Sequence, residues 1–181
     1  IKCQNAELNF AKFEDLLTGN FYVGWDLGRE KDPGAVVVIN KQDDVLILVH
    51  RCTFKLGVPY VSQMSYIKSI CDRWNHVNAV FYDHTGTKGM DEQINRAGFP
   101  GVSGVDFTHP LKHGMAMTLK QAMMEPRASD KHLGESARRQ FELPYDQDIM
   151  AELNIEQWEQ PKGSELYTFS HPEGGHDDVF W

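Results

Sequence analysis

The chain has 181 residues and a formal net charge of −8, with 41% hydrophobic and 24% charged residues. This length suits a single domain. The composition is that of a globular protein, which excludes the disordered and fibrous classes. The longest apolar runs, residues 35–39 and 45–49, are five residues long, far short of the roughly 18 that a membrane-spanning helix needs, so we expect no membrane partner.

The start of the chain and its cysteines indicate the kind of protein and the compartment to expect. The sequence opens without Met and without an apolar signal segment, so we expect a fragment of a longer protein. Cys3, Cys52 and Cys71 are odd in number and match no CxxC spacing, which favours free thiols in a reducing, cytoplasmic compartment.

Charge is distributed unevenly along the sequence. Residues 140–181 carry ten acidic residues and one basic residue, whereas residues 105–139 carry six basic and four acidic residues. An acidic protein is a poor non-specific binder of polyanions, because phosphate neutralisation needs Lys and Arg. That objection weakens if carboxylates gather into a divalent-cation site, since the bound ion reverses the local sign of charge.

The first part of the chain predicts an antiparallel meander. Residues 1–19 read as a lead-in segment or linker, so we place the domain at residues 20–181. Short β-rich runs follow at 21–27, 35–39 and 45–51, separated by turn formers. An amphipathic helix then begins at Pro59, with apolar residues at 60, 64, 67, 71 and 74.

The later elements alternate between strand and helix, which predicts parallel pairing. In order, the sequence predicts a strand buried on both faces at 78–83, a helix over 87–97, a strand near 101–107, a helix from about 108, a polar basic stretch over 127–140, a helix over 146–158 and a strand at 166–170. We therefore expect an α/β fold, in which an antiparallel meander and parallel βαβ units share one mixed sheet flanked by helices.

Acidic residues beside glycines are the candidates for chemistry. Asp26 lies between two glycines on its strand face, which leaves space for a ligand. Asp83 ends the buried strand, the position where open α/β sheets bind ligands. If the two strands are parallel neighbours, these carboxylates lie roughly 5 Å apart. Asp177 and Asp178 follow a Gly-Gly-His sequence near the end of the chain.

Each acid alone also has a structural explanation. A strand-end turn would account for Asp26, a turn before a helix for Asp83, and helix capping for the Asp177-Asp178 pair. The whole set fits those explanations less well than it fits metal binding. Carboxylates can hold two Mg²⁺ or Mn²⁺ ions about 3.5–4 Å apart, which activate a water and stabilise the leaving oxygen in phosphodiester hydrolysis.

An ordered set of motifs runs through the chain. It comprises Gly24-Trp25-Asp26-Leu27-Gly28, Asp32-Pro33-Gly34-Ala35, Tyr82-Asp83-His84-Thr85-Gly86, Phe107-Thr108-His109-Pro110-Leu111-Lys112 and His176-Asp177-Asp178. Over roughly residues 21–181 this set resembles the nuclease domain of the large terminase subunit of tailed bacteriophages and related viruses. The resemblance implies an RNase H-like fold and metal-dependent endonucleolytic cutting of concatemeric double-stranded viral DNA during genome packaging.

The resemblance also implies roles for the acidic residues. Asp26, Asp83 and one or both of Asp177 and Asp178 would bind two Mg²⁺ or Mn²⁺ ions. A water activated between the ions would attack the phosphodiester in line, leaving a 5′ phosphate and a 3′ hydroxyl, so no side-chain nucleophile is required.

Histidines and basic residues near these motifs are further candidates. His84 and His176 adjoin the acids and would be ligands or outer partners of ligands, or otherwise polar loop residues. The basic residues expected to contact DNA phosphates are Lys88, Lys112, Lys120, Arg127, Lys131, Arg138 and Arg139. For Lys112 a solvated helix lysine is the alternative, and for the cluster over 127–139 the alternative is a solvated loop.

The sequence departs from the family in lacking a GxxxxGK[ST] motif, so the family's ATPase motor is absent from this chain. The partners implied are that ATPase domain in the full-length protein, the small terminase subunit and the portal protein, in the cytoplasm of the host cell. Three other functions remain open: another RNase H-like nuclease or resolvase, an actin-like ATP-binding half, and a non-catalytic docking domain.

Overall fold

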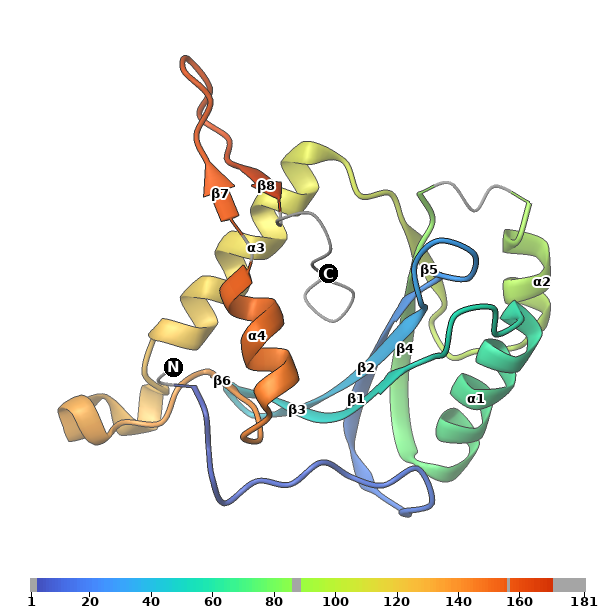
Figure 1. Ribbon diagram of the computed structural model, residues 1–181. Coiled ribbons are helices and arrows are strands. Elements are labelled where there is room, and N and C mark those ends of the chain that lie inside the picture. The colour runs from blue at the N-terminus through green and yellow to red at the C-terminus, as the bar shows by residue number, and fades with distance from the viewer. Residues whose placement is uncertain (1–2, 86–88, 156, 171–181) are drawn as a thin grey trace.

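The computed structural model describes residues 3–85, 89–155 and 157–170. A six-stranded mixed sheet forms its centre, with the strand order β5-β4-β1-β2-β3-β6 (Figure 1). The strands are β1 (Thr18–Asp26), β2 (Ala35–Gln42), β3 (Val45–Thr53), β4 (Asn75–Asp83), β5 (Ser103–Val105) and β6 (Phe141–Glu142).

The pairing pattern confirms the mixed sheet that the sequence predicts. β1, β2 and β3 form the antiparallel meander. β4 pairs in parallel with β1, β5 pairs in parallel with β4, and β6 pairs in parallel with β3. β4 therefore returns to the centre of the sheet, next to β1, after the chain has passed through the meander and a helix.

Helices cover both faces of the sheet (Figure 1). α1 (Tyr60–Arg73) and α2 (Asp91–Arg96) lie on one face, and α3 (His109–Met124) and α4 (Gln147–Ile155) lie on the other. α2 begins at Asp91, later than the sequence predicts, and residues 86–88 lie outside the described part. None of the helices in that part is long and apolar enough to cross a membrane.

Alternation along β1 separates the two faces. Phe21, Val23 and Trp25 are buried and pack with the apolar side of α1, whereas Tyr22 and Asp26 line the face toward α3. Fully burying an apolar side chain of this size contributes about 1.5–3 kcal/mol. The packing of β1 on α1 therefore fixes the strand whose last residue is Asp26.

The strand over β4 is not buried on both faces as the sequence predicts. Val80 and Tyr82 are buried against α1 and α2, but Phe81 is 41% exposed. Its side chain lines a cleft on the α3 face of the sheet. The run of apolar residues in β4 is therefore continuous because one face of the strand packs in the core and the other face lines the cleft.

A two-stranded sheet replaces the end of the predicted helix over 146–158. The helix ends at Ile155, and β7 (Gln157–Glu159) pairs antiparallel with β8 (Thr168–Ser170). The ring of Trp158 lies 4.9 Å from that of Tyr167, and Lys120 Nζ lies 3.7 Å from the Trp158 ring centroid. These contacts outweigh the helical periodicity of the segment.

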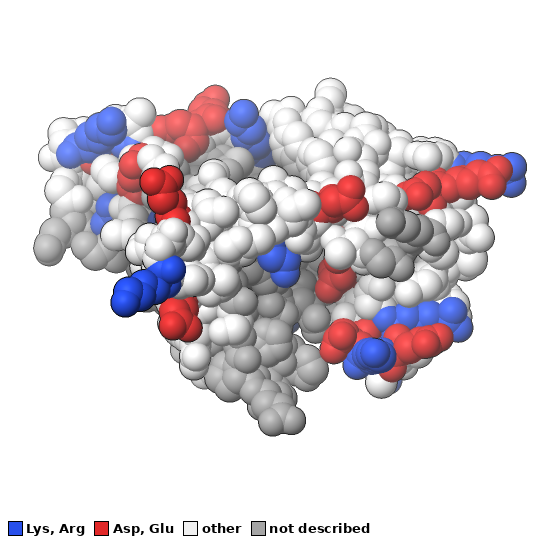
Figure 2. Space-filling model, turned by 90° about the horizontal axis from the view of Figure 1, so that it is seen from above, with Lys and Arg blue, Asp and Glu red and all other residues white. Residues whose placement is uncertain are grey.

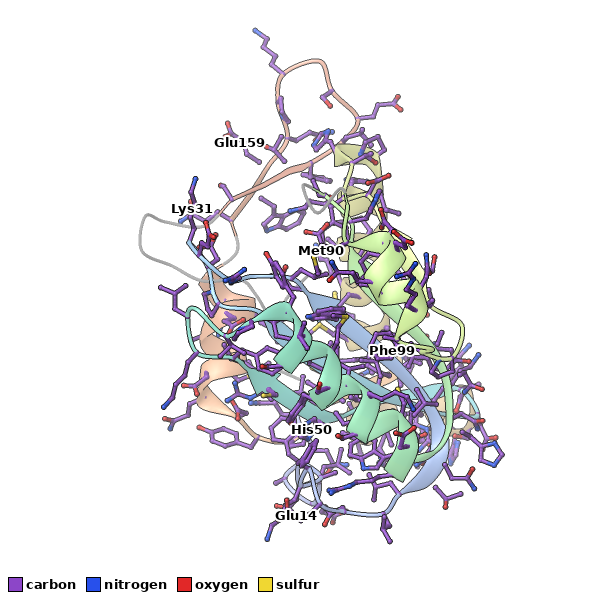
Figure 3. The ribbon with its side chains drawn as sticks, turned by 90° about the vertical axis from the view of Figure 1, so that its right-hand side faces the viewer. Glu14, Lys31, His50, Met90, Phe99 and Glu159 are labelled. Atoms are coloured by element: carbon purple, nitrogen blue, oxygen red, sulfur yellow. The ribbon has the colours of Figure 1, made fainter. Side chains whose placement is uncertain are left out.

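Residues 3–17 pack against the rest of the protein. Cys3 is buried, the Ala11 amide donates to the Val49 carbonyl at 2.7 Å, and the Trp74 indole donates to the Asp15 carbonyl at 2.9 Å. Figure 3 shows Glu14 of this segment at the lower end of the molecule near His50, with Lys31 at the other end. The lead-in segment therefore runs along the end of the sheet away from the loop that follows β1.

Candidate functional site

Asp26 and Asp83 end two neighbouring parallel strands. Trp25 lies opposite Tyr82 in the register of β1 and β4, so the following residues, the two aspartates, occupy adjacent positions. Neighbouring strands are about 4.8 Å apart, and the parallel arrangement on which the predicted spacing depends is present. Both residues are half-buried and line the same cleft.

The cleft lies between the sheet and the start of α3 and has a volume of about 470 Å³. Apart from the two aspartates, its lining is largely apolar and includes Tyr22, Phe81, Val105, Phe107, Leu111 and Met115. Apolar walls weaken solvent screening, so charges at the end of such a cleft interact more strongly than at an open surface. Two adjacent carboxylates in this setting favour a divalent cation with oxygen ligands.

Close packing, and not only space for a ligand, explains the glycines on either side of Asp26. A Cβ on Gly28 would lie 2.3 Å from the Pro33 carbonyl oxygen. A Cβ on Gly24 would lie 3.1 Å from Val37 Cγ2 on the neighbouring strand. Gly28 therefore permits a close approach of the backbone in the loop between β1 and β2, and this approach shapes the end of β1.

The loop after β4 is tied to the loop after β5. The Thr85 amide donates to Asp83 Oδ1 at 2.7 Å, and the Phe107 amide donates to Thr85 Oγ1 at 2.9 Å. The His84 amide donates to the Val105 carbonyl at 2.9 Å. Asp83 is therefore positioned by two strand ends rather than by one flexible turn.

His84 bridges two carboxylates on the α2 side of the sheet. Its Nδ1 lies 2.8 Å from Asp106 Oδ1 and its Nε2 lies 3.2 Å from Asp91 Oδ2. These two hydrogen bonds raise the pKa of His84, the bond to Asp106 first, because they favour the form that donates from both nitrogens. With both ring nitrogens on carboxylates, His84 supports the loop and is poorly placed to bind a cation.

Tyr82 extends this network into the core. Its hydroxyl donates to Asp91 Oδ1 at 2.6 Å. Burial and the Asp91 carboxylate raise the pKa of Tyr82 to about 12, and the same hydrogen bond lowers the pKa of Asp91. The start of α2 is thereby joined to the end of β4.

Gln63 supports the other strand end, and the sequence analysis missed it. The side chain is fully buried on α1, and its amide nitrogen donates to the Gly28 carbonyl at 2.9 Å while its oxygen accepts from the Trp25 indole at 2.9 Å. The signal that could have revealed it is a polar residue on the apolar face of a helix, between Tyr60 and Ile67.

The two lysines of α3 lie at different positions along the helix, and their side chains contact different elements. Lys112 Nζ lies 5.6 Å from the ring centroid of Phe107, a residue that lines the cleft. Lys120 lies farther along and covers the Trp158 ring. The structure therefore places Lys112 beside the aspartates' cleft and Lys120 against β7.

The other basic residues lie away from the cleft. The segment over 128–136, a 3-10 helix, is at the lower left of Figure 1, beyond the end of α3 that is far from the ends of β1 and β4. Arg138 forms two hydrogen bonds with Glu142, at 2.6 and 2.5 Å. Arg139 is buried and donates to the Met124 carbonyl at 3.1 Å. These two arginines are thus used within the fold.

Arg127 and Lys131 belong to the same remote region. Arg127 is half-buried, with its Nε 3.6 Å from Asp44 Oδ1, and Lys131 is exposed. Figure 2 faces the end of the molecule where β1 and β4 finish, and the described acidic and basic side chains on that face form mixed clusters around its edge. The structure does not bring the predicted basic cluster to the two aspartates.

Part of the predicted site lies outside the described residues. This applies to Lys88, His176, Asp177 and Asp178. Within residues 3–85, 89–155 and 157–170, no three His, Cys, Asp or Glu side chains are grouped so as to hold a metal ion. The described part therefore supplies a pair of carboxylates at this site.

Comparison with protein families and with curated proteins found no match. Solved structures do match. The large terminase nuclease from thermophilic phage G20c with bound magnesium superposes with a TM-score of 0.68, at 18% identity, over 89% of this chain and 76% of that one. The large terminase nuclease domain of Thermus phage P74-26 gives a TM-score of 0.64, at 18% identity, over 88% and 74% of the two chains. This chain has the fold of a large terminase nuclease domain.

Longer terminases and other metal-bound structures match the same fold. The chain covers 39% of the large terminase from another thermophilic bacteriophage, with a TM-score of 0.57 and 12% identity. It corresponds in fold to one part of that longer terminase. Among the similar terminase structures, one G20c nuclease was determined with bound zinc and a large terminase subunit of bacteriophage Sf6 with calcium.

Proposed function

We propose that this chain is the endonuclease domain of a large terminase subunit, which cuts concatemeric double-stranded viral DNA during genome packaging with the help of two divalent cations. The observation that carries the proposal is the pairing of Asp26 with Asp83 at the adjacent ends of two parallel strands. The terminase nuclease fold supports it, because the similar G20c nuclease was determined with magnesium and with zinc, and a large terminase subunit of bacteriophage Sf6 with calcium.

The chain's own residues would divide the work among them. Asp26 and Asp83 would hold Mg²⁺ or Mn²⁺ together with Asp177, Asp178 or both. Bound cations would activate a water and stabilise the leaving oxygen. The Thr85 amide holds one oxygen of Asp83 in a fixed direction, and the apolar walls of the cleft limit the water around the reacting phosphate. Lys112, beside the cleft, would contact a phosphate.

The proposed setting is that of a full-length terminase. The ATPase domain of the full-length protein, the small terminase subunit and the portal protein would be the partners, and the host cytoplasm would be the location. The double-stranded DNA would be brought to the cleft mainly by these partners, because this chain has an acidic net charge.

Conversion of supercoiled plasmid to nicked and linear forms tests the proposal. Wild-type protein is compared with Asp83→Asn and with Asp72→Asn, an exposed acid on α1, in EDTA, Mg²⁺ or Mn²⁺. We expect metal-dependent cleavage by the wild type and by Asp72→Asn. We expect a loss of about 100-fold or more in Asp83→Asn, since a ligand to the cation is removed.

Two results would contradict the proposal. Folded wild-type protein that cuts nothing with either ion would favour a docking domain with a nuclease fold. Equal cleavage by Asp83→Asn would remove this carboxylate from the chemistry.

A further inference from the structure

Gln63 is a buried amide whose hydrogen-bonding groups are all used. Its side chain is 0% exposed. The oxygen accepts from the Trp25 indole at 2.9 Å, and the nitrogen donates to the carbonyls of Gly28 at 2.9 Å and Val58 at 3.1 Å. A fully paired amide in the core is a directional connection, since a shift of any partner leaves a buried polar group unpaired.

The groups that Gln63 joins lie on both sides of Asp26 in the chain. Trp25 immediately precedes the aspartate, and Gly28 follows it by two residues. The Trp25 side chain points toward α1, while Asp26 lines the cleft on the opposite face of the sheet. Gln63 therefore holds the backbone of the strand end from behind, without contact with the cleft.

The start of β2 closes around the same amide. A Cβ on Gly34 would lie 2.6 Å from Gln63 Oε1 and 3.0 Å from the carbonyl oxygen of Asp26. The Phe54 amide donates to the Gly34 carbonyl at 2.8 Å, and the Gly57 amide donates to the Arg29 carbonyl at 2.8 Å. The loops over 28–34 and 54–58 are thus bonded to each other, and Gln63 bonds to both.

We infer that Gln63 is a positioning residue for the Asp26 carboxylate, which fixes the end of β1 so that Asp26 keeps its place beside Asp83. The inference rests on the proposed function, because the place of Asp26 matters for cation binding. Groups that orient metal ligands from outside the coordination sphere typically change metal affinity by about 10–100-fold when they are removed. Loss of the Gln63 amide should therefore weaken cation binding in addition to destabilising the fold.

The test compares Gln63→Met with Ile70→Val, a truncation of a fully buried residue two turns farther along the same helix. Mn²⁺ binding is measured by isothermal titration calorimetry, thermal unfolding is measured in EDTA, and plasmid cleavage is measured against Mn²⁺ concentration. We expect Gln63→Met to raise the dissociation constant for Mn²⁺ about tenfold, with a matching rise in the Mn²⁺ concentration for half-maximal cleavage. We expect Ile70→Val to leave both within about twofold.

A second variant covers the case in which Gln63→Met does not fold. Trp25→Phe keeps an aromatic ring in the core and removes the indole N–H that Gln63 accepts, together with part of the fused ring system. We expect it to raise the Mn²⁺ dissociation constant at least about threefold, in the same direction as Gln63→Met.

The outcomes separate this inference from the proposed function. Wild-type protein that neither binds Mn²⁺ nor cuts DNA overturns the proposed function and this inference with it. Wild-type protein that does both, beside a folded Gln63→Met with unchanged Mn²⁺ affinity, overturns the inference alone. If Gln63→Met is unfolded, an unchanged Mn²⁺ affinity in Trp25→Phe likewise overturns the inference alone.

Discussion

His50 is a buried imidazole whose protonation state is decided by its neighbours. Its Nδ1 lies 2.8 Å from the Ala11 carbonyl, which can only accept, so Nδ1 carries the proton. Nε2 then accepts from the Tyr66 hydroxyl at 2.7 Å. Burial lowers the pKa of His50 because the charged form loses solvation, and this outweighs the opposing bond to Ala11.

A pH-dependent stability follows from His50. Its folded-state pKa lies below the ordinary value of about 6.5, so just below that pH the unfolded chain binds more protons than the folded one. The contribution of His50 to the free energy of unfolding is therefore full above pH 6.5 and is lost as the pH falls toward the folded-state pKa. We expect His50→Gln to lack this loss in urea unfolding between pH 5 and 7.5. A difference between the two proteins that is constant over this range would contradict the assignment.

Gly28 is the second residue with a testable effect. A Cβ there would lie 2.3 Å from a backbone oxygen, so Gly28→Ala should push the loop after β1 outward. We expect a fall in the free energy of unfolding of about 1–3 kcal/mol by urea denaturation, together with slower DNA cleavage. Gly114→Ala is the control, because this helical glycine has open space and should gain about 0.5–1 kcal/mol. Equal stability of Gly28→Ala and wild type would show that the loop adjusts without cost.

Sequence reasoning at this scale succeeded where a residue's position follows from its own element. Asp26 and Asp83 could each be placed at a strand end from the hydrophobic pattern, and the parallel pairing on which their predicted spacing depended is present. The use of Arg139 could not be foreseen, because its partner is the Met124 carbonyl at the end of α3, which only the folded chain brings near. Arg138 bonds to Glu142, which is four residues away in the sequence. Basic residues close in sequence therefore formed a cluster in the prediction but are largely paired in the structure.

At the scale of elements, the lead-in segment acts as part of the core rather than as a separate linker. Phe13 stacks on Tyr66 of α1, with ring centroids 4.6 Å apart, and the guanidinium carbon of Arg73 lies 4.9 Å from the Phe13 ring centroid. The Asn75 amide at the start of β4 donates to the Leu17 carbonyl at 2.8 Å. The segment thus joins α1, β3 and β4.

Phe13→Ala tests the contribution of this segment. We expect a loss of about 2 kcal/mol in the free energy of unfolding, below the 3–5 kcal/mol of a fully buried Phe because Phe13 is half-buried. Leu16→Ala, in the same segment but 80% exposed, should change stability by less than about 0.5 kcal/mol. Chemical denaturation of the two variants decides the matter, and equal effects would mean that the segment is not anchored by its aromatic contact.

The long elements were predictable, and so were two of the short strands, β5 and β8. Apolar runs between turn formers reveal β2, β3 and β4, and a period near 3.6 residues reveals α1 and α3. β6 has two residues and β7 has three, too few for a periodic pattern. The position of β6 is decided by its pairing with β3, which is distant in the sequence. The position of β7 is decided by its pairing with β8, which follows a turn that the sequence analysis did not predict.

At the scale of the whole molecule, charge limits how the protein meets DNA. The net charge is −8, and several basic side chains are already engaged with acids. Few phosphates can be neutralised, so DNA binding should be weak. The exponent that relates the affinity to the salt concentration should also be small. Delivery by a partner would then matter more than intrinsic affinity.

Binding of a duplex of about 30 base pairs to Asp83→Asn in the presence of Ca²⁺ measures this exponent. We expect the logarithm of the affinity to fall with the logarithm of salt concentration with a slope of magnitude below about 4. Adding Lys112→Met should reduce the slope by about one, whereas Lys12→Met in the lead-in segment should leave it unchanged. A steep slope that is insensitive to Lys112 would place the DNA on another surface.

The adjacency of β1 and β4 has a consequence for the newly made protein. The strands β2 and β3 and the helix α1 lie between β1 and β4 in the chain. Pairing of β1 with β4 therefore closes a long loop and is a non-local step of folding, which is slow compared with helix or hairpin formation. Until that step is complete, Asp26 and Asp83 are on separate parts of the chain. A nascent or partly folded chain therefore has no paired carboxylates, and under the proposed function it would not cut DNA before the sheet has closed.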